Sequence, residues 1–413
     1  AALSMSKIDS KELLRRAQAY APQAEKFLGD MVRIPSVNKR DPEKNAAERI
    51  HDEALKLGFE SKFVAKDPQR PNVLARYGSG KIGFALIGHI DTVAEGDPAS
   101  WSFPPFEAHV DNGRLIGRGA ADNKAGIAVG LYTLQLLREL ELLDTQRFCV
   151  TVAGVSDEEA GACSTLGVRY LLDTQELRAA GAIYTYTSDF VCIGHRGLLR
   201  LDIRTRGESI HAGIDAWHQK TQGLNAVTAL ADILLRLEKL RIDVQLVPGF
   251  EKLGFTITPG TIFQGGVYES IVPESASAII DMRLLPGQDK EAVLQRVDAI
   301  IKEVEAERPG LKSEVMRKVD IPGAAIPLDH PLARIAQDYT ETFTGKRWPV
   351  AGAGPGNEGY MLIGAGIPTL CGFGATGGNP HAPDEWVLLS SLPVTMAIYA
   401  GIIHDYLNQI KGA

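Results

Sequence analysis

The alternation of helical segments with short apolar strands is the feature that most constrains the fold of this chain. The runs 82–87 and 147–155 read as buried strands, and an apolar helix is predicted between them at 126–143. Buried strands joined by helices are typical of an α/β sheet with crossover connections. Further helices are predicted at 9–31, 46–57, 331–344 and 390–409, and further strands at 59–65, 72–77 and 368–373.

A different pattern begins near Gly197 and ends near residue 318. Strands and helices follow there in the order βαββαβ, which is the split ferredoxin-like motif. The α/β pattern resumes after Pro322, so the smaller domain is predicted to be inserted into the larger one. The predicted elements of the insertion are strand 198–206, helix 219–240, strands 253–263 and 275–285, helix 289–307 and strand 311–318.

Composition narrows the classes of partner. The 413 residues are 45% apolar and 23% charged, with a net charge of −7 and no basic stripe, so we expect no nucleic acid partner. No apolar stretch approaches the ~20 residues of a spanning helix, so we expect no membrane partner. The start of the sequence, 1–5, lacks the pattern of a signal peptide. Four scattered cysteines favour a reducing, cytoplasmic location: Cys149, Cys163, Cys192 and Cys371.

His89 and Asp91 close the first buried strand. Side chains two residues apart on extended backbone point the same way, so the carboxylate of Asp91 is expected to reach the His89 ring. A carboxylate that accepts one ring N–H leaves the other nitrogen free to bind a metal. A histidine with a purely structural role at a strand end also fits this short motif.

Three other stretches carry similar groups. Asp122 precedes a helix, the pair Glu158 and Glu159 ends a strand, and His381 lies among turn-forming residues. Taken singly, they fit a helix N-cap, a solvated acidic turn and a surface histidine. Taken together with His89, they all follow or neighbour the C-terminal ends of predicted strands, where α/β sheets bind ligands. Nitrogen and oxygen donors without cysteine suit Zn, Mn or Co, and Glu158 is left as general base for a metal-activated water.

Seven stretches, in this order, resemble the metallohydrolase (metallopeptidase) family of acetylornithine deacetylase, succinyl-diaminopimelate desuccinylase, aminoacylase and glutamate carboxypeptidase. The resemblance implies a catalytic α/β domain of the zinc-peptidase type at 1–196 and 319–413, with an inserted α+β ferredoxin-like dimerisation domain at 197–318. The stretches cover the chain from about residue 20 to its end: 88–93, 117–126, 156–161, 210–213, 265–274, 281–283 and 381–385.

The resemblance also implies roles in a metal centre. Asp122 resembles a carboxylate that bridges two metals, beside a cis Asp122–Asn123 peptide. Glu159 and His381 resemble ligands of one metal, and His89 a ligand of the other. Glu158 then resembles the general base, and Asp91 the partner of His89.

Further implied roles concern the substrate. His211 resembles a histidine that reaches the partner subunit's active site and stabilises the oxyanion, which implies a homodimer. Arg283 resembles an arginine that holds a substrate carboxylate, and Asn225 and Ser270 fall at substrate-binding positions.

Three positions depart from the family pattern. Thr185 stands where the family has a metal-binding carboxylate, Ser270 stands where many members have asparagine, and 356–359 replaces a Ser/Thr-Asp segment. Two divalent ions ~3.5–4 Å apart need anionic ligands. We therefore expect one tightly held metal and a weak or empty second site, unless Asp189 supplies the missing ligand. The tight site is expected on Asp122, Glu159 and His381.

The expected function is that of a metal-dependent amidohydrolase acting on a C–N bond of a small substrate that carries a carboxylate, such as an N-acyl amino acid or small peptide. Two alternatives stay open: an aminohydrolase or amidase acting on a non-peptide, aromatic amine or amide, and an inactive binding module. The Gly-x-Gly-x-x-Gly spacings at 78–83 and 354–359 lack the strand-then-helix context of a nucleotide site.

Overall fold

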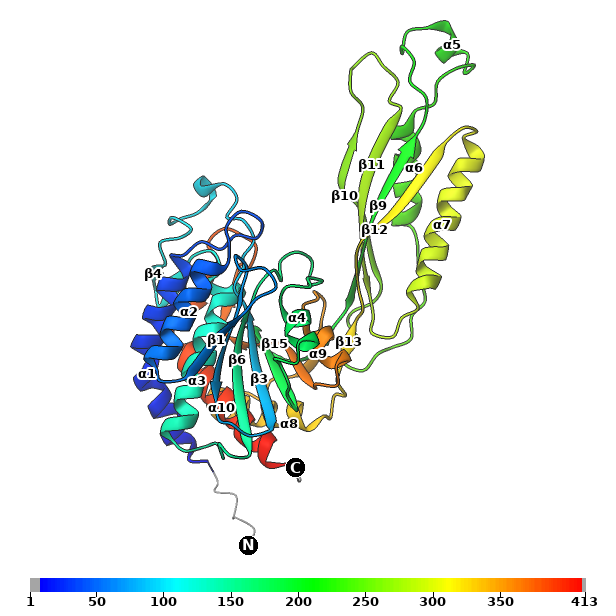
Figure 1. The fold of residues 1–413 in the computed structure, drawn as a ribbon. Coiled ribbons are helices and arrows are strands. Elements are labelled where there is room, and N and C mark those ends of the chain that lie inside the picture. Colours follow the sequence, from blue (N-terminus) through cyan, green and yellow to red (C-terminus); the bar gives the residue numbers. More distant parts are fainter. Residues whose placement is uncertain (1–7, 411–413) are drawn as a thin grey trace. The chain divides into compact units, whose positions relative to one another are not determined.

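The computed structural model describes residues 8–410, so the expectation about residues 1–5 lies outside the described residues. The chain divides into two compact units (Figure 1). The first comprises residues 8–194 of the described chain with Ala325–Ala353 and 357–410, and the second comprises His195–Ala324 with Gly354–Gly356.

A six-stranded sheet forms the centre of the first unit. The strands β6, β3, β7 and β15 are parallel, and β1 and β2 join antiparallel at one edge. All but the first residue of β3 is buried, as expected for a parallel strand covered on both faces. The order across the sheet is β1 (Glu60–Val64), β2 (Asn72–Tyr77), β6 (Phe148–Val155), β3 (Ile82–His89), β7 (Gly181–Thr187) and β15 (Thr369–Ala375).

Helices cover both faces of this sheet. Alternate residues of β3 belong to different cores: Phe84 and Leu86 pack in the larger one, and Ala85 and Ile87 in the smaller one. Successive side chains of a strand point to opposite faces, so the two cores lie on opposite sides. The larger core holds α1 (Ser10–Val32), α2 (Lys44–Lys56), α3 (Ala125–Glu139), α8 (Pro331–Thr344) and α10 (Ser391–Asn408); the smaller holds α4 (Val168–Asp173) and α9 (Gly359–Gly364).

A small antiparallel sheet joins two loops that the sequence separates widely. Trp386 pairs with Ile116, which brings the segment before Asp122 beside the loop that contains His381. The segment 94–118, in which the sequence pattern indicates no helix or strand, therefore contains regular structure. The elements are η1 (Pro98–Ser100), β4 (His109–Asp111), β5 (Arg114–Ile116), η2 (Ala120–Lys124), β16 (Gly377–Gly378) and β17 (Trp386–Leu388).

The second unit is an antiparallel sheet with helices on one face. The strand order β10-β11-β9-β12 and the sequence βαββαβ are those of the split ferredoxin-like motif. Within the predicted helix 219–240 only Ala226–Glu238 is helical; a separate short helix, Asp215–His218, precedes it, and Gly223 between the two has a left-handed φ of +89°. The elements are β9 (Gly197–Arg206), α5 (Asp215–His218), α6 (Ala226–Glu238), β10 (Thr256–Gly265), β11 (Ser275–Leu284), α7 (Lys290–Glu307) and β12 (Lys312–Ile321).

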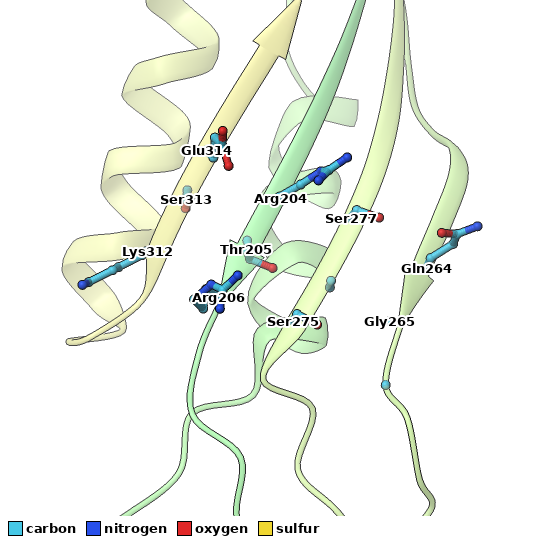
Figure 2. A pocket seen from close by; sticks show the side chains of 12 residues that line it. Arg204, Thr205, Arg206, Gln264, Gly265, Ser275, Ser277, Lys312, Ser313 and Glu314 are labelled. Carbon is cyan, nitrogen blue, oxygen red and sulfur yellow. The ribbon is translucent and has the colours of Figure 1, made fainter. Parts of the chain in front are cut away.

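The open face of this second sheet carries a hollow of about 560 Å³ (Figure 2). Arg204, Arg206 and Lys312 line it together with Ser275 and Ser277.

A short third sheet consists of β8 (Val191–His195), β13 (Ala324–Ala325) and β14 (Val350–Ala353). Within residues 8–410, no helix is both long enough and apolar enough to cross a bilayer.

Candidate metal centre

The carboxyl ends of the parallel strands carry a cluster of two histidines and three carboxylates. Asp122 lies between the histidines: its Oδ1 is 2.8 Å from His89 Nε2, and its Oδ2 is 3.0 Å from His381 Nε2. Glu159 Oε1 is 3.2 Å from the same nitrogen of His381. The Asp122–Asn123 peptide is cis, which confirms that expectation. One carboxylate that faces two histidines has the arrangement expected of a bridging ligand.

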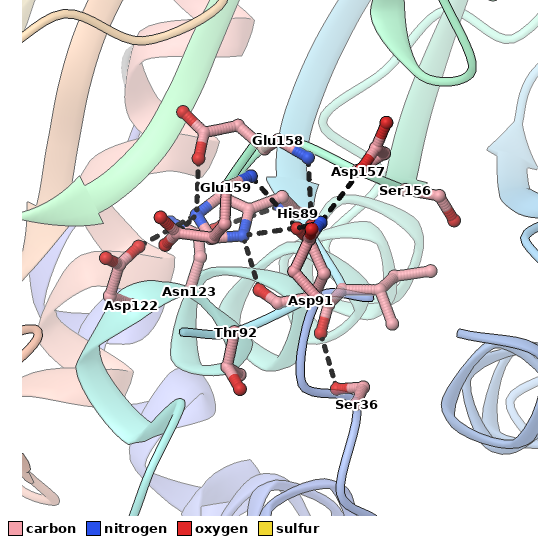
Figure 3. Close-up of polar contacts among 12 residues, drawn as sticks. Ser36, His89, Asp91, Thr92, Asp122, Asn123, Ser156, Asp157, Glu158 and Glu159 are labelled. Atoms are coloured by element: carbon pink, nitrogen blue, oxygen red, sulfur yellow. Dashed lines mark hydrogen bonds and ion pairs between the residues drawn. The ribbon is translucent and has the colours of Figure 1, made fainter. Parts of the chain in front are cut away.

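Two sets of donor atoms are close enough to hold an ion. One set is Asp122, Glu159 and His381, and the other is His89, Glu158 and Glu159. In the second set, His89 Nε2 lies 3.6 Å from Glu158 Oε2 and 3.8 Å from Glu159 Oε1 (Figure 3). All five residues named in the sequence analysis as ligands or base therefore meet at one place.

The carboxylate of Asp91 lies closer to the backbone of Glu158 and Glu159 than to the ring of His89. His89 Nδ1 is 2.8 Å from the main-chain oxygen of Asp91 but 3.6 Å from its carboxylate. That carboxylate accepts the backbone N–H groups of Glu158 at 3.0 Å and Glu159 at 2.9 Å. The expected carboxylate partner of the ring is thus replaced by a carbonyl, because the turn N–H groups occupy the carboxylate. Either partner leaves Nε2 free for a metal.

Glu385 supports the Asp122 segment and was not identified from the sequence. Its Oε2 accepts the N–H groups of Ala121 at 2.9 Å and Asp122 at 3.0 Å, and its Oε1 is 2.7 Å from Arg118 Nη1. The guanidinium of Arg118 lies over the ring of Trp101, 5.1 Å from its centroid. The signal was present in the His-Ala-Pro-Asp-Glu stretch, but its partners are distant in sequence.

The electrostatics of the cluster fit a divalent cation. Burial raises the pKa of Glu158 well above its usual range, with Glu159 adding to the effect. Hydrogen bonds to Asp122 and Glu159 raise the pKa of His381 to about 10. Burial alone would lower the pKa of His89, but the carboxylates of Glu158 and Asp122 outweigh it and raise that pKa. Oxygen and imidazole donors with this excess of negative charge are a suitable ligand set for Zn, Mn or Co.

Thr185 does not replace the missing carboxylate. Its buried hydroxyl donates to the carbonyl of Ile87 at 2.9 Å and lies 3.2 Å from Asn123 Oδ1. Asp189 is exposed beyond the end of β7 and belongs to neither donor set.

Three of the four predicted substrate residues meet at one end of the second unit. Ala212 N donates to Ser270 O at 2.8 Å, and His211 pairs with Ile271. Gly213 N donates to His211 Nδ1 at 3.0 Å, so a neutral ring carries its proton on Nε2. Asn225 caps α6, its Oδ1 accepting from residues 227 and 228 at 3.0 and 3.1 Å.

Arg283 lies towards the other end of the same sheet. Its Nε is 2.8 Å from Asp281 Oδ1, and Asp281 also accepts from Arg200 at 2.9 Å. Burial and the neighbouring Arg283 guanidinium lower the pKa of Arg196. Arg196 is therefore a second cation near Arg283 that the sequence analysis did not single out.

Comparisons with known proteins agree on a family. The family model described as "Peptidase family M20/M25/M40" matches residues 85–405. The uncharacterized protein YgeY of Escherichia coli strain K12 is 30% identical over 410 residues, which cover 96% of this chain and 97% of that protein. A probable succinyl-diaminopimelate desuccinylase of Staphylococcus epidermidis is 28% identical, covering 93% and 98%. An acetylornithine deacetylase of Vibrio campbellii is 28% identical, covering 69% and 73%.

Solved structures share the fold. A metallo-carboxypeptidase of the M20 family, Sso-CP2 from Sulfolobus solfataricus, has a TM-score of 0.73 at 18% identity and covers 93% of this chain and 99% of its own. The YXEP protein of Bacillus subtilis, titled a dinuclear metal binding peptidase, has a TM-score of 0.70 at 16% identity, covering 95% and 100%. The resemblance, the fold class and the expectation of a hydrolase acting on C–N bonds are confirmed.

Proposed function

Because this chain belongs to the peptidase family M20/M25/M40, we propose that it is a metal-dependent amidohydrolase that cleaves a C–N bond in a small, carboxylate-bearing amide. N-acyl amino acids and small peptides are the proposed substrates. The observation that carries the proposal is the position of Glu158: its Oε2 lies 3.6 Å from His89 Nε2, and it is outside the set formed by Asp122, Glu159 and His381. A pure binding module needs no such base, and nothing in this cluster favours the alternative of a non-peptide amine.

The residues of the chain divide the chemistry between them. Asp122, Glu159 and His381 would hold a divalent cation, which would supply Lewis-acid chemistry there. Glu158 removes a proton from the attacking water and returns it to the leaving nitrogen. The raised pKa of Glu158 suits this work, because a base must also hold the proton until the nitrogen takes it.

Substrate recognition is assigned to the second unit. His211 presents Nε2–H, the donor that an oxyanion requires. Arg283 and Arg196 supply the positive charge for a carboxylate, and Ser270 and the free amide N–H₂ of Asn225 offer further hydrogen bonds.

We further propose a homodimer in which His211 serves the partner's site. Ser275 and Arg283 stand at the two ends of β11, eight residues or about 26 Å apart at ~3.3 Å per residue. His211 lies beyond the Ser275 end, so one small substrate cannot touch His211 and Arg283 of the same chain. The edge strands β10 and β12 also expose Phe263 and Val315, each 40% accessible, on edges that can pair with a second copy.

Replacement of Glu158 by Gln tests the function. We expect kcat on N-acyl amino acids to fall by about 10²–10⁴-fold, since that is the usual contribution of general acid–base catalysis. Bound Zn, Mn or Co and the unfolding temperature should stay unchanged. The assay is hydrolysis of a panel of N-acetyl and N-succinyl amino acids and dipeptides. Near-normal turnover in this variant would exclude the proposed role.

A further inference from the structure

Asn38 connects the two loops that carry the metal cluster. Its Nδ2 is 2.8 Å from Asp91 Oδ2 and 2.8 Å from Asp157 Oδ1. A side-chain amide N–H₂ has two hydrogens, so one can serve each carboxylate. Asp91 belongs to the loop after β3, and Asp157 to the loop after β6. Only asparagine and glutamine side chains offer two donors from one nitrogen without adding charge.

The contact is placed directly behind the acid pair. Asp91 accepts the N–H groups of Glu158 and Glu159, so any shift of its carboxylate is transmitted to both residues. Asp157 precedes them and has a left-handed φ of +66°, a conformation that disfavours side chains other than Gly, Asn and Asp. Through the carboxylates of Asp91 and Asp157, Asn38 thus restrains the turn that carries Glu158 and Glu159.

An outer set of contacts fixes Asp157 in turn. Arg70 Nη2 lies 2.9 Å from Asp157 Oδ1, and Arg70 Nε lies 2.9 Å from Glu43, which is fully buried. Ser164 Oγ donates to Asp157 Oδ2 at 2.6 Å. Asn38 is itself anchored, since its N–H donates to Thr92 O at 2.8 Å.

From these contacts we infer that Asn38 is a positioning residue for Glu158 and Glu159, with Arg70 holding Asp157 from behind. Only the expected fall in kcat rests on the proposed function. The consequence for metal affinity depends on Glu159 alone. Neither Asn38 nor Arg70 touches the cluster: each acts through the carboxylates of Asp91 or Asp157.

The test replaces the amide by an isosteric carboxylate, Asn38→Asp. This change removes both donors and adds a third negative charge beside Asp91 and Asp157. We expect Co²⁺, measured by chelator competition, to bind about 10- to 100-fold more weakly, as is usual when a partner of a ligand-bearing group is lost. The visible absorption of the Co²⁺ protein should change, and kcat should fall while KM stays within about threefold.

Asn45→Asp is the matched control, because Asn45 is exposed on α2 and the same charge is added there. Arg70→Met and Arg70→Lys provide a second pair, in case Asn38→Asp does not fold: Met should weaken Co²⁺ binding, and Lys should restore part of it. Unchanged Co²⁺ affinity and spectrum in folded Asn38→Asp or Arg70→Met would overturn the inference. A wild-type protein that binds Co²⁺ but cleaves no amide would instead overturn the proposed function.

Discussion

Glu358 is a buried acid in a region already rich in carboxylates. It stands in the segment that departs from the family pattern, its side chain is fully buried, and Tyr184 donates a hydrogen bond of 2.8 Å to it. Burial raises its pKa to about 8, against which the Tyr184 hydrogen bond acts only in part. The carboxyl is therefore largely neutral at pH 7, which spares the cluster one negative charge.

This pKa predicts a pH dependence of stability. Between pH 4.5 and 8 the unfolded chain has lost the Glu358 proton while the folded chain keeps it, so this group lowers the free energy of unfolding as pH rises. Glu358→Gln removes this pH-dependent contribution to the free energy of unfolding. We expect the free energy of unfolding of the variant, relative to that of the wild type, to increase by about 3–5 kcal/mol between pH 4.5 and pH 8, at ~1.4 kcal/mol per pKa unit. Urea unfolding of metal-free protein across this range measures the difference; a constant difference would contradict the prediction.

The metal count also belongs to the scale of single residues. The hydroxyl of Thr185 is hydrogen-bonded to Ile87 O, and Asp189 is exposed and outside both donor sets, so neither supplies the missing carboxylate. The second donor set would have to use Glu158, the proposed base, beside His89 and Glu159. We expect metal analysis after dialysis to give about one ion per chain. Asp189→Asn should leave that number unchanged. Two ions in the wild type, and one in the variant, would show that Asp189 supplies the ligand.

Some of these residues could be predicted from the sequence and some could not. His89 and the pair Glu158 and Glu159 stand at the ends of apolar strands that are visible in the pattern, whereas Asp122 lies in η2 and His381 in a loop. The partners of those residues depend on the fold: Asn38 meets Asp157 across 119 positions, and Glu385 meets Asp122 across 263. A single sequence contains no signal for such pairs.

At the level of elements, the loop containing His381 is held from outside. His381, Asn379 and Asp384 all have left-handed φ values of 56–63°, so the loop depends on external contacts for its shape. Asp384 accepts from Ser102 N at 2.8 Å and from Ser102 Oγ at 2.7 Å. The segment that contains Ser102 therefore supports the loop of the candidate metal ligand His381.

Removal of this support should loosen the ligand. Asp384→Gly deletes the carboxylate but keeps a residue that tolerates positive φ. We expect Co²⁺ to bind about 3- to 10-fold more weakly, by analogy with other residues that orient metal ligands. Asp97→Gly is the control, since Asp97 lies in the same segment as Ser102, where its side chain caps η1. Equal Co²⁺ affinity in both variants would show that the loop containing His381 keeps its shape without the contact between Asp384 and Ser102.

Most of the elements that the sequence analysis missed are short, but the seven-residue strand β7 and the five-residue strand β8 were missed as well. Helices α4 and α9 have six residues each, and β4, β5 and β17 have three. Such segments are shorter than the windows in which a period of 2.0 or 3.6 can be recognised. The long helices and the buried strands β3 and β6 were found because each repeats its pattern several times, whereas the buried strands β7 and β8 were not recognised.

At the scale of the whole molecule, the separation along β11 has a genetic consequence. If His211 serves the partner's site, chains carrying His211→Ala and chains carrying Glu158→Gln should complement each other. Random mixing of two inactive variants gives half mixed dimers, and each mixed dimer has one site with both native residues. About a quarter of wild-type activity should therefore return. No recovery after subunit exchange, verified by mass-tagged chains, would place His211 in its own chain's site.

Co-expression of two different damaged copies would then yield a working enzyme where either copy alone fails. If the proposed dimer holds, the separation of some 26 Å along one strand makes each active site depend on two chains. Selection on such a protein acts on pairs of alleles, and a dominant-negative effect is expected whenever a folded but inactive copy outnumbers the intact one.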